Sequence, residues 1–174
     1  MSGRLRHVRP LLFVLLAVNA AAYATTGRFS EGLDAFAWYL LLALLELETR
    51  RPDWSRRPRI AMTLDVLRLL AAAAVAIAAA SYFVEGEWLD ATNALLWIGV
   101  VIVLELEVRL PATAARHRRR VTGAAFALYA ALAAVALAWL LRGEWLDAYD
   151  ALLWIAAFAL IELDLLDNGA RDNS

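Results

Sequence analysis

Long apolar stretches alternate with short polar segments along this chain, and the alternation predicts membrane-spanning helices. Residues 10–27, 69–84 and 121–141 contain no charged side chain. Each stretch is close to the ~20 residues that a helix needs to cross about 30 Å of hydrocarbon. Residues 33–47, 89–106 and 146–166 are equally apolar apart from a few carboxylates, and each follows a short turn around a glycine. We therefore expect an all-α polytopic membrane protein with six transmembrane helices.

The sequence of the second helix in each pair occurs three times. Gly27, Gly86 and Gly143 lie 59 and then 57 residues apart, and the residues that follow them match without gaps. The matched positions are an aromatic residue (Phe29, Trp88, Trp145), an acid (Glu31, Asp90, Asp147), Asp or Asn (Asp34, Asn93, Asp150), a tryptophan (Trp38, Trp97, Trp154) and a glutamate (Glu46, Glu105, Glu162). This spacing predicts a single membrane domain over residues 1–174, made of parallel helical hairpins at 8–50, 60–109 and 120–166 with a pseudo-threefold arrangement. Residues 167–174 are expected to form a flexible cytoplasmic tail.

The positions of the arginines predict the orientation in the membrane. All 17 basic residues are arginine, and most fall into clusters at residues 4–9, 50–59 and 109–120. The turns near the repeated glycines contain only Arg28 and Arg142. Because basic loops stay in the cytoplasm, we expect both termini to be cytoplasmic and the protein to lie in a bacterial inner (plasma) membrane. The clusters are expected to contact anionic lipid headgroups rather than nucleic acid, since the formal net charge is only -1.

The first 24 residues allow a second interpretation, as a cleaved signal peptide. They combine a basic start, an apolar core at 11–18 and small residues at 20–24. Cleavage would leave five spans. We favour retention, because this segment stands where the repeat requires a first helix.

Composition supports the membrane class and argues against a soluble enzyme. Hydrophobic residues make up 63% of the chain and charged residues only 20%, against roughly 45 to 50% apolar residues in soluble domains. Cysteine is absent, so disulfides and metal-thiolate sites are excluded. We find no histidine at metal-ligand spacing, phosphate-binding glycine loop or nucleophile elbow, and therefore expect no catalytic activity and no cofactor.

The repeated acids at the helix starts have two interpretations. Carboxylates at a helix N-terminus accept hydrogen bonds from free backbone amides and favour the positive end of the helix dipole. The same residues could instead form the entrance for a solute or ion. These residues are Glu31, Asp34, Asp90, Asn93, Asp147 and Asp150.

The repeated tryptophans lie on the same helix face as these acids. Trp38, Trp97 and Trp154 each follow the first acid by seven residues, which is about 10 Å along a helix. Their indoles could meet at a central axis as part of an ion or solute site. Alternatively, each indole packs against a neighbouring helix.

The repeated glutamates are the strongest candidates for an ion site. Glu46, Glu105 and Glu162 lie 15 residues after the first acid, about 22 Å along the helix, against about 30 Å of hydrocarbon. In a straight perpendicular helix, at least one carboxylate per repeat must therefore lie within the apolar layer, thin the bilayer locally or face a polar interior. They could form a ring that binds a cation or shares a proton. Alternatively, acids at these helix ends pair with arginines, for example Glu48 with Arg50 or Arg51 and Glu107 with Arg109. Asp65 and Arg68 can form a local ion pair.

These patterns favour a small cation or proton transporter, channel or ion-binding protein. The alternative is a non-catalytic membrane scaffold or accessory subunit. Neither interpretation identifies a particular metal, substrate or protein partner.

Overall fold

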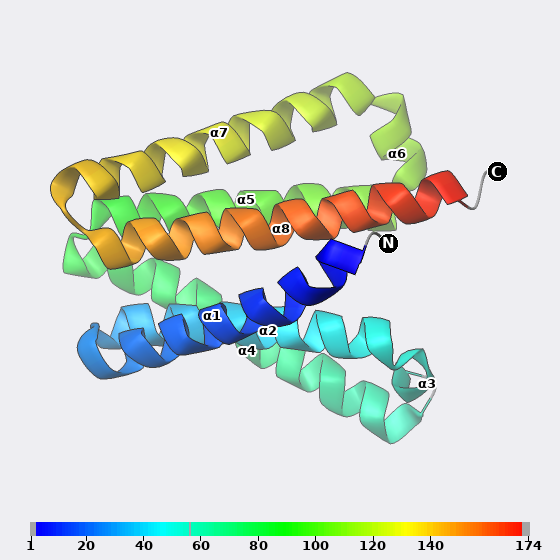
Figure 1. Cartoon of the computed structure of the whole chain (residues 1–174), viewed down its shortest axis with the longest axis horizontal. Coiled ribbons are helices and arrows are strands. Elements are labelled where there is room, and N and C mark those ends of the chain that lie inside the picture. Colours follow the sequence, from blue (N-terminus) through cyan, green and yellow to red (C-terminus); the bar gives the residue numbers. More distant parts are fainter. Residues whose placement is uncertain (1–2, 56, 172–174) are drawn as a thin grey trace. The chain divides into compact units, whose positions relative to one another are not determined.

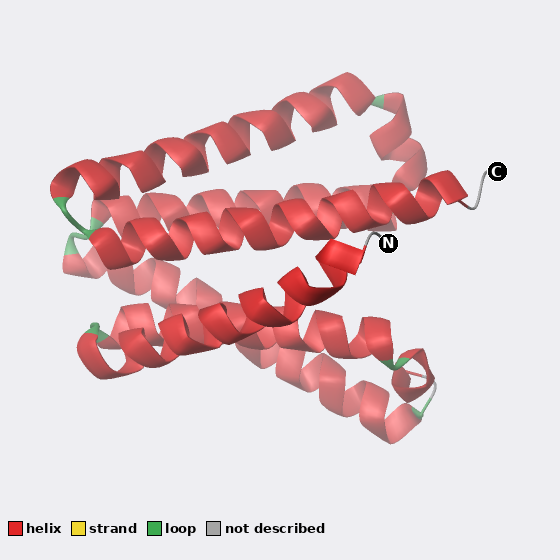
Figure 2. Ribbon diagram, viewed as in Figure 1, coloured by secondary structure: helices red, strands yellow, loops and turns green. Residues whose placement is uncertain are grey.

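The computed structural model describes residues 3–55 and 57–171, and every element in this part of the chain is helical (Figures 1 and 2). The prediction of an all-α fold is therefore confirmed for these residues. The helices are α1 (Gly3–Thr26), α2 (Phe29–Arg50), α3 (Pro52–Ser55), α4 (Pro58–Glu85), α5 (Trp88–Arg109), α6 (Pro111–Arg116), α7 (Arg118–Arg142) and α8 (Trp145–Arg171). α8 continues through residues 167–171, where the sequence predicts a flexible tail.

The long helices are joined in pairs by short turns at the repeated glycines. Gly86 and Gly143 both end a helix in the left-handed conformation, with φ of 80°, which glycine adopts without steric cost. The following amides, of Glu87 and Glu144, donate to the carbonyls of Tyr82 and Trp139 at 2.9 and 3.0 Å. Gly27 ends α1 without a positive φ, and its amide donates to the Tyr23 carbonyl. The two later turns therefore share one geometry, which the earliest turn does not adopt.

The short helices α3 and α6 were not predicted from the sequence. Both lie in the arginine-rich connections, and each begins with a proline, Pro52 or Pro111. Proline suits the first helical position because its fixed φ matches the helix and the missing N–H has no partner there. These connections are thus partly helical rather than open loops.

The described residues form two compact units, whose boundaries fall inside α1 and α5. In residues 17–91, which we call the Arg28 unit, α2 packs against α4, and α3 contacts both. In residues 3–16 and 92–171, which we call the Trp97 unit, α7 packs against α8. α5 contacts α7 at Gly99, where a Cβ atom would lie 2.9 Å from a methyl group of Leu128. In both units, therefore, the second helix of one predicted hairpin contacts the first helix of the next, through helix packing for α2 and α4 and at Gly99 for α5 and α7.

Three helices of the described part are long and apolar enough to cross a membrane. They are α4, residues 88–107 of α5, and α7, with mean hydropathies of 2.0, 1.8 and 2.2 over their most apolar windows. α1 contributes a shorter apolar helix, Pro10–Thr26. The remaining predicted spans, 33–47 and 146–166, lie in α2 and α8, where carboxylates stand near both ends of the apolar segment. Apolar length alone therefore supports three of the six predicted spans.

Candidate functional site

Positions that match in the sequence repeat have matching burial. Trp38, Trp97 and Trp154 are 8%, 4% and 6% exposed, whereas the aromatic residues at the helix starts are 84%, 67% and 69% exposed at Phe29, Trp88 and Trp145. Matched positions in the first helix of each pair are buried as well. One set is Leu16, Val75 and Leu132, and the other is Tyr23, Tyr82 and Trp139. One face of each matched helix is therefore an interior face.

The repeated tryptophans of the second and third copies, Trp97 and Trp154, are in contact. The ring centroids of Trp97 and Trp154 lie 6.3 Å apart with an edge-on angle of 63°. Phe158, one turn after Trp154, lies 4.9 Å from Trp97 and 6.2 Å from Trp154. This aromatic cluster joins α5 to α8 within the Trp97 unit, and Trp38 belongs to the Arg28 unit. Edge-to-face contact between aromatic rings is a favourable packing arrangement, so the contact agrees with helix packing by the indoles.

A cluster of charges joins two helix turns in the Arg28 unit. We call Arg28, Glu31, Glu85, Glu87 and Asp90 the Arg28 ion cluster. The Arg28 guanidinium bonds Glu87 and lies 2.6 Å from Glu31, 4.0 Å from Glu85 and 3.8 Å from Asp90. Since the hydrogen bond to Glu87 and the contacts to Glu31 outweigh the cost of burial, the pKa of Arg28 rises above its ordinary value. One cation thus faces four carboxylates drawn from the ends of α1/α2 and α4/α5.

The acids at the helix starts differ in their surroundings. The Glu31 carboxylate accepts a hydrogen bond from the Arg28 amide at 2.9 Å, which is the contact that a capping role requires. Asp90 belongs to the Arg28 ion cluster. Asp147 and Asp150 are half-buried near the start of α8. The Oδ1 atoms of Asp34 and Asn93 are buried. Among the described residues, no group donates a hydrogen bond to Oδ1 of Asn93.

The repeated glutamates near the other helix ends also differ from one another. Glu46 in the Arg28 unit accepts a hydrogen bond from Nε of Arg50 at 2.5 Å. Glu105 is exposed in the Trp97 unit. The Glu162 side chain lies outside the described residues. The carboxylate ring therefore remains a prediction.

Glu48 forms an ion pair, but the predicted partner, Arg50 or Arg51, was wrong. Arg50 bonds Glu46, one helical turn before it, and Glu48 instead accepts a hydrogen bond from Arg68 of α4 at 2.5 Å. Arg68 also donates to Asp65 at 3.1 Å, as the spacing predicts. The sequence offered only local partners for Glu48, because the packing of α2 on α4 brings together residues that lie 20 positions apart. The Glu48–Arg68 pair thus links two helices.

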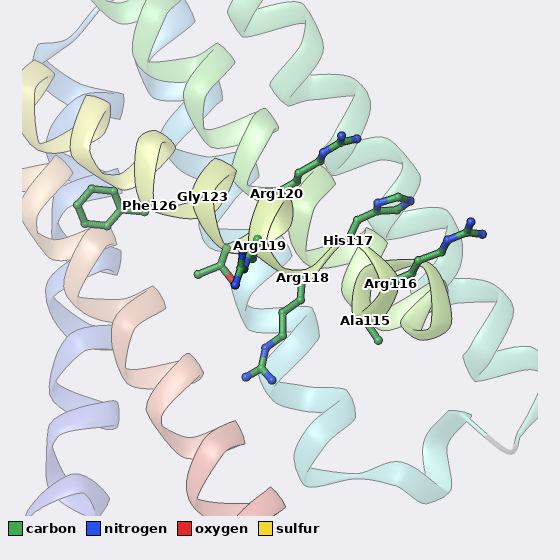
Figure 3. A pocket seen from close by; sticks show the side chains of 9 residues that line it. Ala115, Arg116, His117, Arg118, Arg119, Arg120, Gly123 and Phe126 are labelled. Atoms are coloured by element: carbon green, nitrogen blue, oxygen red, sulfur yellow. The ribbon is translucent and has the colours of Figure 1, made fainter.

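A pocket at the α6–α7 corner was missed by sequence reasoning. It is lined by Arg116, His117, Arg118, Arg119 and Arg120, with Thr122, Gly123 and Phe126 further along α7 (Figure 3). The sequence signal was present, because no Asp or Glu occurs between Glu107 and Glu144. From the sequence, these arginines are expected to mark the cytoplasmic side and to contact anionic lipid headgroups, but no pocket is predicted there. Across the residues that the structure describes, histidines and acids form no group of three or more suited to a metal ion.

The sequence matches no known protein family and no curated protein, and the fold matches no solved structure.

Proposed function

We propose that the chain is a multi-pass protein of a bacterial inner membrane, built from three parallel helical hairpins with a pseudo-threefold arrangement. The observation that carries this proposal is the exposed apolar surface of α4, α5 and α7. In their most apolar windows only 17%, 22% and 22% of the residues are buried. Soluble proteins rarely expose apolar patches larger than a few hundred Å². A lipid environment removes the free-energy cost of exposing this apolar surface to water.

Two observations support the hairpin repeat. The matched tryptophans and first-helix residues share the same burial in all three copies. In addition, α2 packs on α4 while α5 contacts α7, so one type of helix contact occurs twice. Both observations are what a rotation that relates successive hairpins would produce.

Within the membrane, the arrangement favours a non-catalytic scaffold or accessory subunit. Glu46 is held by Arg50 and Glu48 by Arg68, so these two acids already have counter-charges. The Trp97–Trp154–Phe158 cluster fills its helix contact with aromatic rings. Paired acids and packed indoles stabilise helix association without requiring a transported ion.

A cation or proton pathway is the second candidate, and one observation favours it. The Asn93 Oδ1 atom is buried without a donor from the described residues, at a position occupied by Asp34 and Asp150 in the other copies. A buried oxygen without a donor is costly unless water or a cation occupies the place next to it. This position is therefore the best candidate for an ion contact.

The membrane topology can be tested by single-cysteine labelling, because the natural chain has no cysteine. Glu144→Cys at the α7–α8 turn should react with a membrane-impermeant maleimide in spheroplasts that retain an intact inner membrane. Thr113→Cys in α6 should react only after permeabilisation. Release of the protein by alkaline carbonate would contradict membrane integration, and labelling of both sites from outside would contradict the orientation.

Flux measurements in proteoliposomes separate the two candidates. A scaffold should show no proton, Na⁺ or K⁺ flux above that of empty vesicles, and cations should not change its thermal stability. A pathway should conduct, and conduction should fall both in Asn93→Leu and in the triple variant with glutamine at Glu46, Glu105 and Glu162. Exposed Glu107 offers a control through Glu107→Gln, which should leave any flux unchanged.

A further inference from the structure

The corner between α6 and α7 concentrates positive charge without local acids. Arg116 ends α6, His117 lies between the helices, and Arg118, Arg119 and Arg120 form the first turn of α7. All five side chains are exposed and line one pocket. Figure 3 shows the guanidinium groups pointing in different directions around the corner. The corner therefore presents several separate cationic donors.

These arginines differ from three arginines of the Arg28 unit. Arg28, Arg50 and Arg68 each bond a carboxylate. Among the described residues, the four arginines of the corner have no acid within ion-pair distance. Four neighbouring guanidinium groups repel one another, and an external anion would relieve that repulsion. The pocket thus has the charge that an anionic ligand requires.

The helix that starts here adds two further features. No side-chain hydrogen bond caps α7 at His117, so the positive end of the helix dipole adjoins the arginines. α7 then continues as the most hydropathic candidate span, and Phe126, which is 76% exposed, stands on it at the far end of the pocket. Cationic donors at the start of an apolar helix, followed by an exposed aromatic ring, match the order of phosphate and acyl chain in a phospholipid.

We propose that the α6–α7 corner binds the phosphate of an anionic phospholipid through its arginines, with Phe126 beside the acyl chain. This proposal depends on the membrane location proposed above. It goes further by assigning lipid binding to one pocket rather than to basic loops in general.

The test compares two variants of equal charge in purified full-length protein. Arg119→Gln/Arg120→Gln removes two corner arginines, and three basic residues of the corner connection, Arg109, Arg116 and Arg118, still hold the topology. Arg57→Gln/Arg59→Gln removes two exposed arginines at the start of α4, four and six positions after the acid Asp53 in the sequence. Binding is followed as the rise in thermal unfolding temperature on titration with phosphatidylglycerol in detergent micelles, with phosphatidylcholine as the neutral lipid.

Phosphatidylglycerol should stabilise the natural chain and the α4 variant alike, with saturation, while phosphatidylcholine should not. The corner variant should need about 30-fold more phosphatidylglycerol, because each arginine near an anionic surface contributes roughly fivefold in affinity. Phe126→Ala should weaken binding less than the double variant. Each lipid response is read as the difference from the same protein in lipid-free micelles, so a general loss of stability does not imitate weaker binding.

Three outcomes would overturn the proposal. They are an unchanged titration in the corner variant, an equal loss in the α4 variant, and the same saturating stabilisation from inorganic phosphate. Carbonate extraction reports separately on membrane integration. A protein that stays in the membrane but fails this titration therefore loses only the lipid site.

Discussion

The two units hold their helices together in different ways, although they contain copies of the same repeat. The Arg28 unit uses charge, with Arg28 facing four carboxylates and Arg68 linking α4 to Glu48 of α2. The Trp97 unit uses packing, with Trp97, Trp154 and Phe158 in mutual contact and Gly99 close to Leu128. The repeat therefore determines which face of each helix is buried, while the residues that differ between copies determine the type of contact.

Three positions that differ between copies contribute to this difference. Arg68 corresponds to Ala125 in the third copy, so Glu107, which corresponds to Glu48, has no matching arginine. Gly99 of α5 and Leu128 of α7 correspond to Leu40 of α2 and Ala71 of α4. The large residue is therefore on α7 in one helix pair and on α2 in the other. Exchange of large and small residues across an interface preserves its total volume. One architecture can then accommodate different sequences at equivalent contacts.

The largest effect is expected from removing one ring of the aromatic cluster. Trp154→Ala should lower the free energy of unfolding by about 3 kcal/mol, because it leaves a cavity and removes contacts to two rings. Added salt should not change this loss. The measurement is unfolding of the purified protein by increasing SDS fraction in mixed micelles, at low and high NaCl.

Trp145 provides a matched control on the same helix, since it is 69% exposed. Trp145→Ala should cost roughly 0.5 kcal/mol or less. If the two variants were equally destabilised, the Trp97–Trp154–Phe158 cluster would not stabilise the contact between α5 and α8.

An intermediate, salt-dependent effect is expected at the Arg28 ion cluster. Arg28→Gln leaves four carboxylates without their shared cation and should cost about 2 kcal/mol at low ionic strength. Because its side chain is 44% exposed, screening should reduce this cost by roughly half at ~0.5 M NaCl. The measurement is the same SDS unfolding experiment at two salt concentrations.

Arg142→Gln is the control, because it removes one arginine from the exposed end of α7 at another helix turn. It should leave the free energy of unfolding nearly unchanged.

The raised pKa of Arg28 gives a second check. A cation that is stabilised in the folded state contributes fully to the free energy of unfolding at pH values below its pKa in the unfolded state. That contribution is lost only as the pH rises through its pKa in the folded state. The Arg28 contribution should thus not decline between pH 7 and 9, and a decline there would contradict a charged, paired guanidinium.

The long helices could be predicted from the sequence, because the length of an apolar stretch and the repeated glycine depend on local chemistry, whereas the pseudo-threefold arrangement stays a prediction. The turns at Gly86 and Gly143 and the burial of Trp38, Trp97 and Trp154 follow from the repeat. The helices α3 and α6 were missed, because four and six residues are too few to show hydrophobic periodicity.

The contacts between helices could be predicted less well. Arg68 was assigned to Asp65 on its own helix, yet it also bonds Glu48, because register between helices depends on packing that no local pattern encodes. The Arg28 ion cluster was missed for the same reason, since its members come from two turns. The pocket at Arg116–Arg120 could have been found from the long interval without acids, which is a local signal.

The smallest effect is expected for the Glu48–Arg68 pair, and it tests whether charge couples α2 to α4. Glu48→Gln, Arg68→Gln and the double variant form a thermodynamic cycle with an expected coupling of about 0.5 to 1.5 kcal/mol. The coupling should be modest because both side chains are partly exposed, at 26% and 42%. Glu107→Gln serves as the matched single control in the Trp97 unit and should change stability by less than ~0.5 kcal/mol. A coupling near zero would show that the pair contributes no attraction between the helices. Apolar packing would then join α2 to α4, and the contrast between the two units would depend on the Arg28 ion cluster alone.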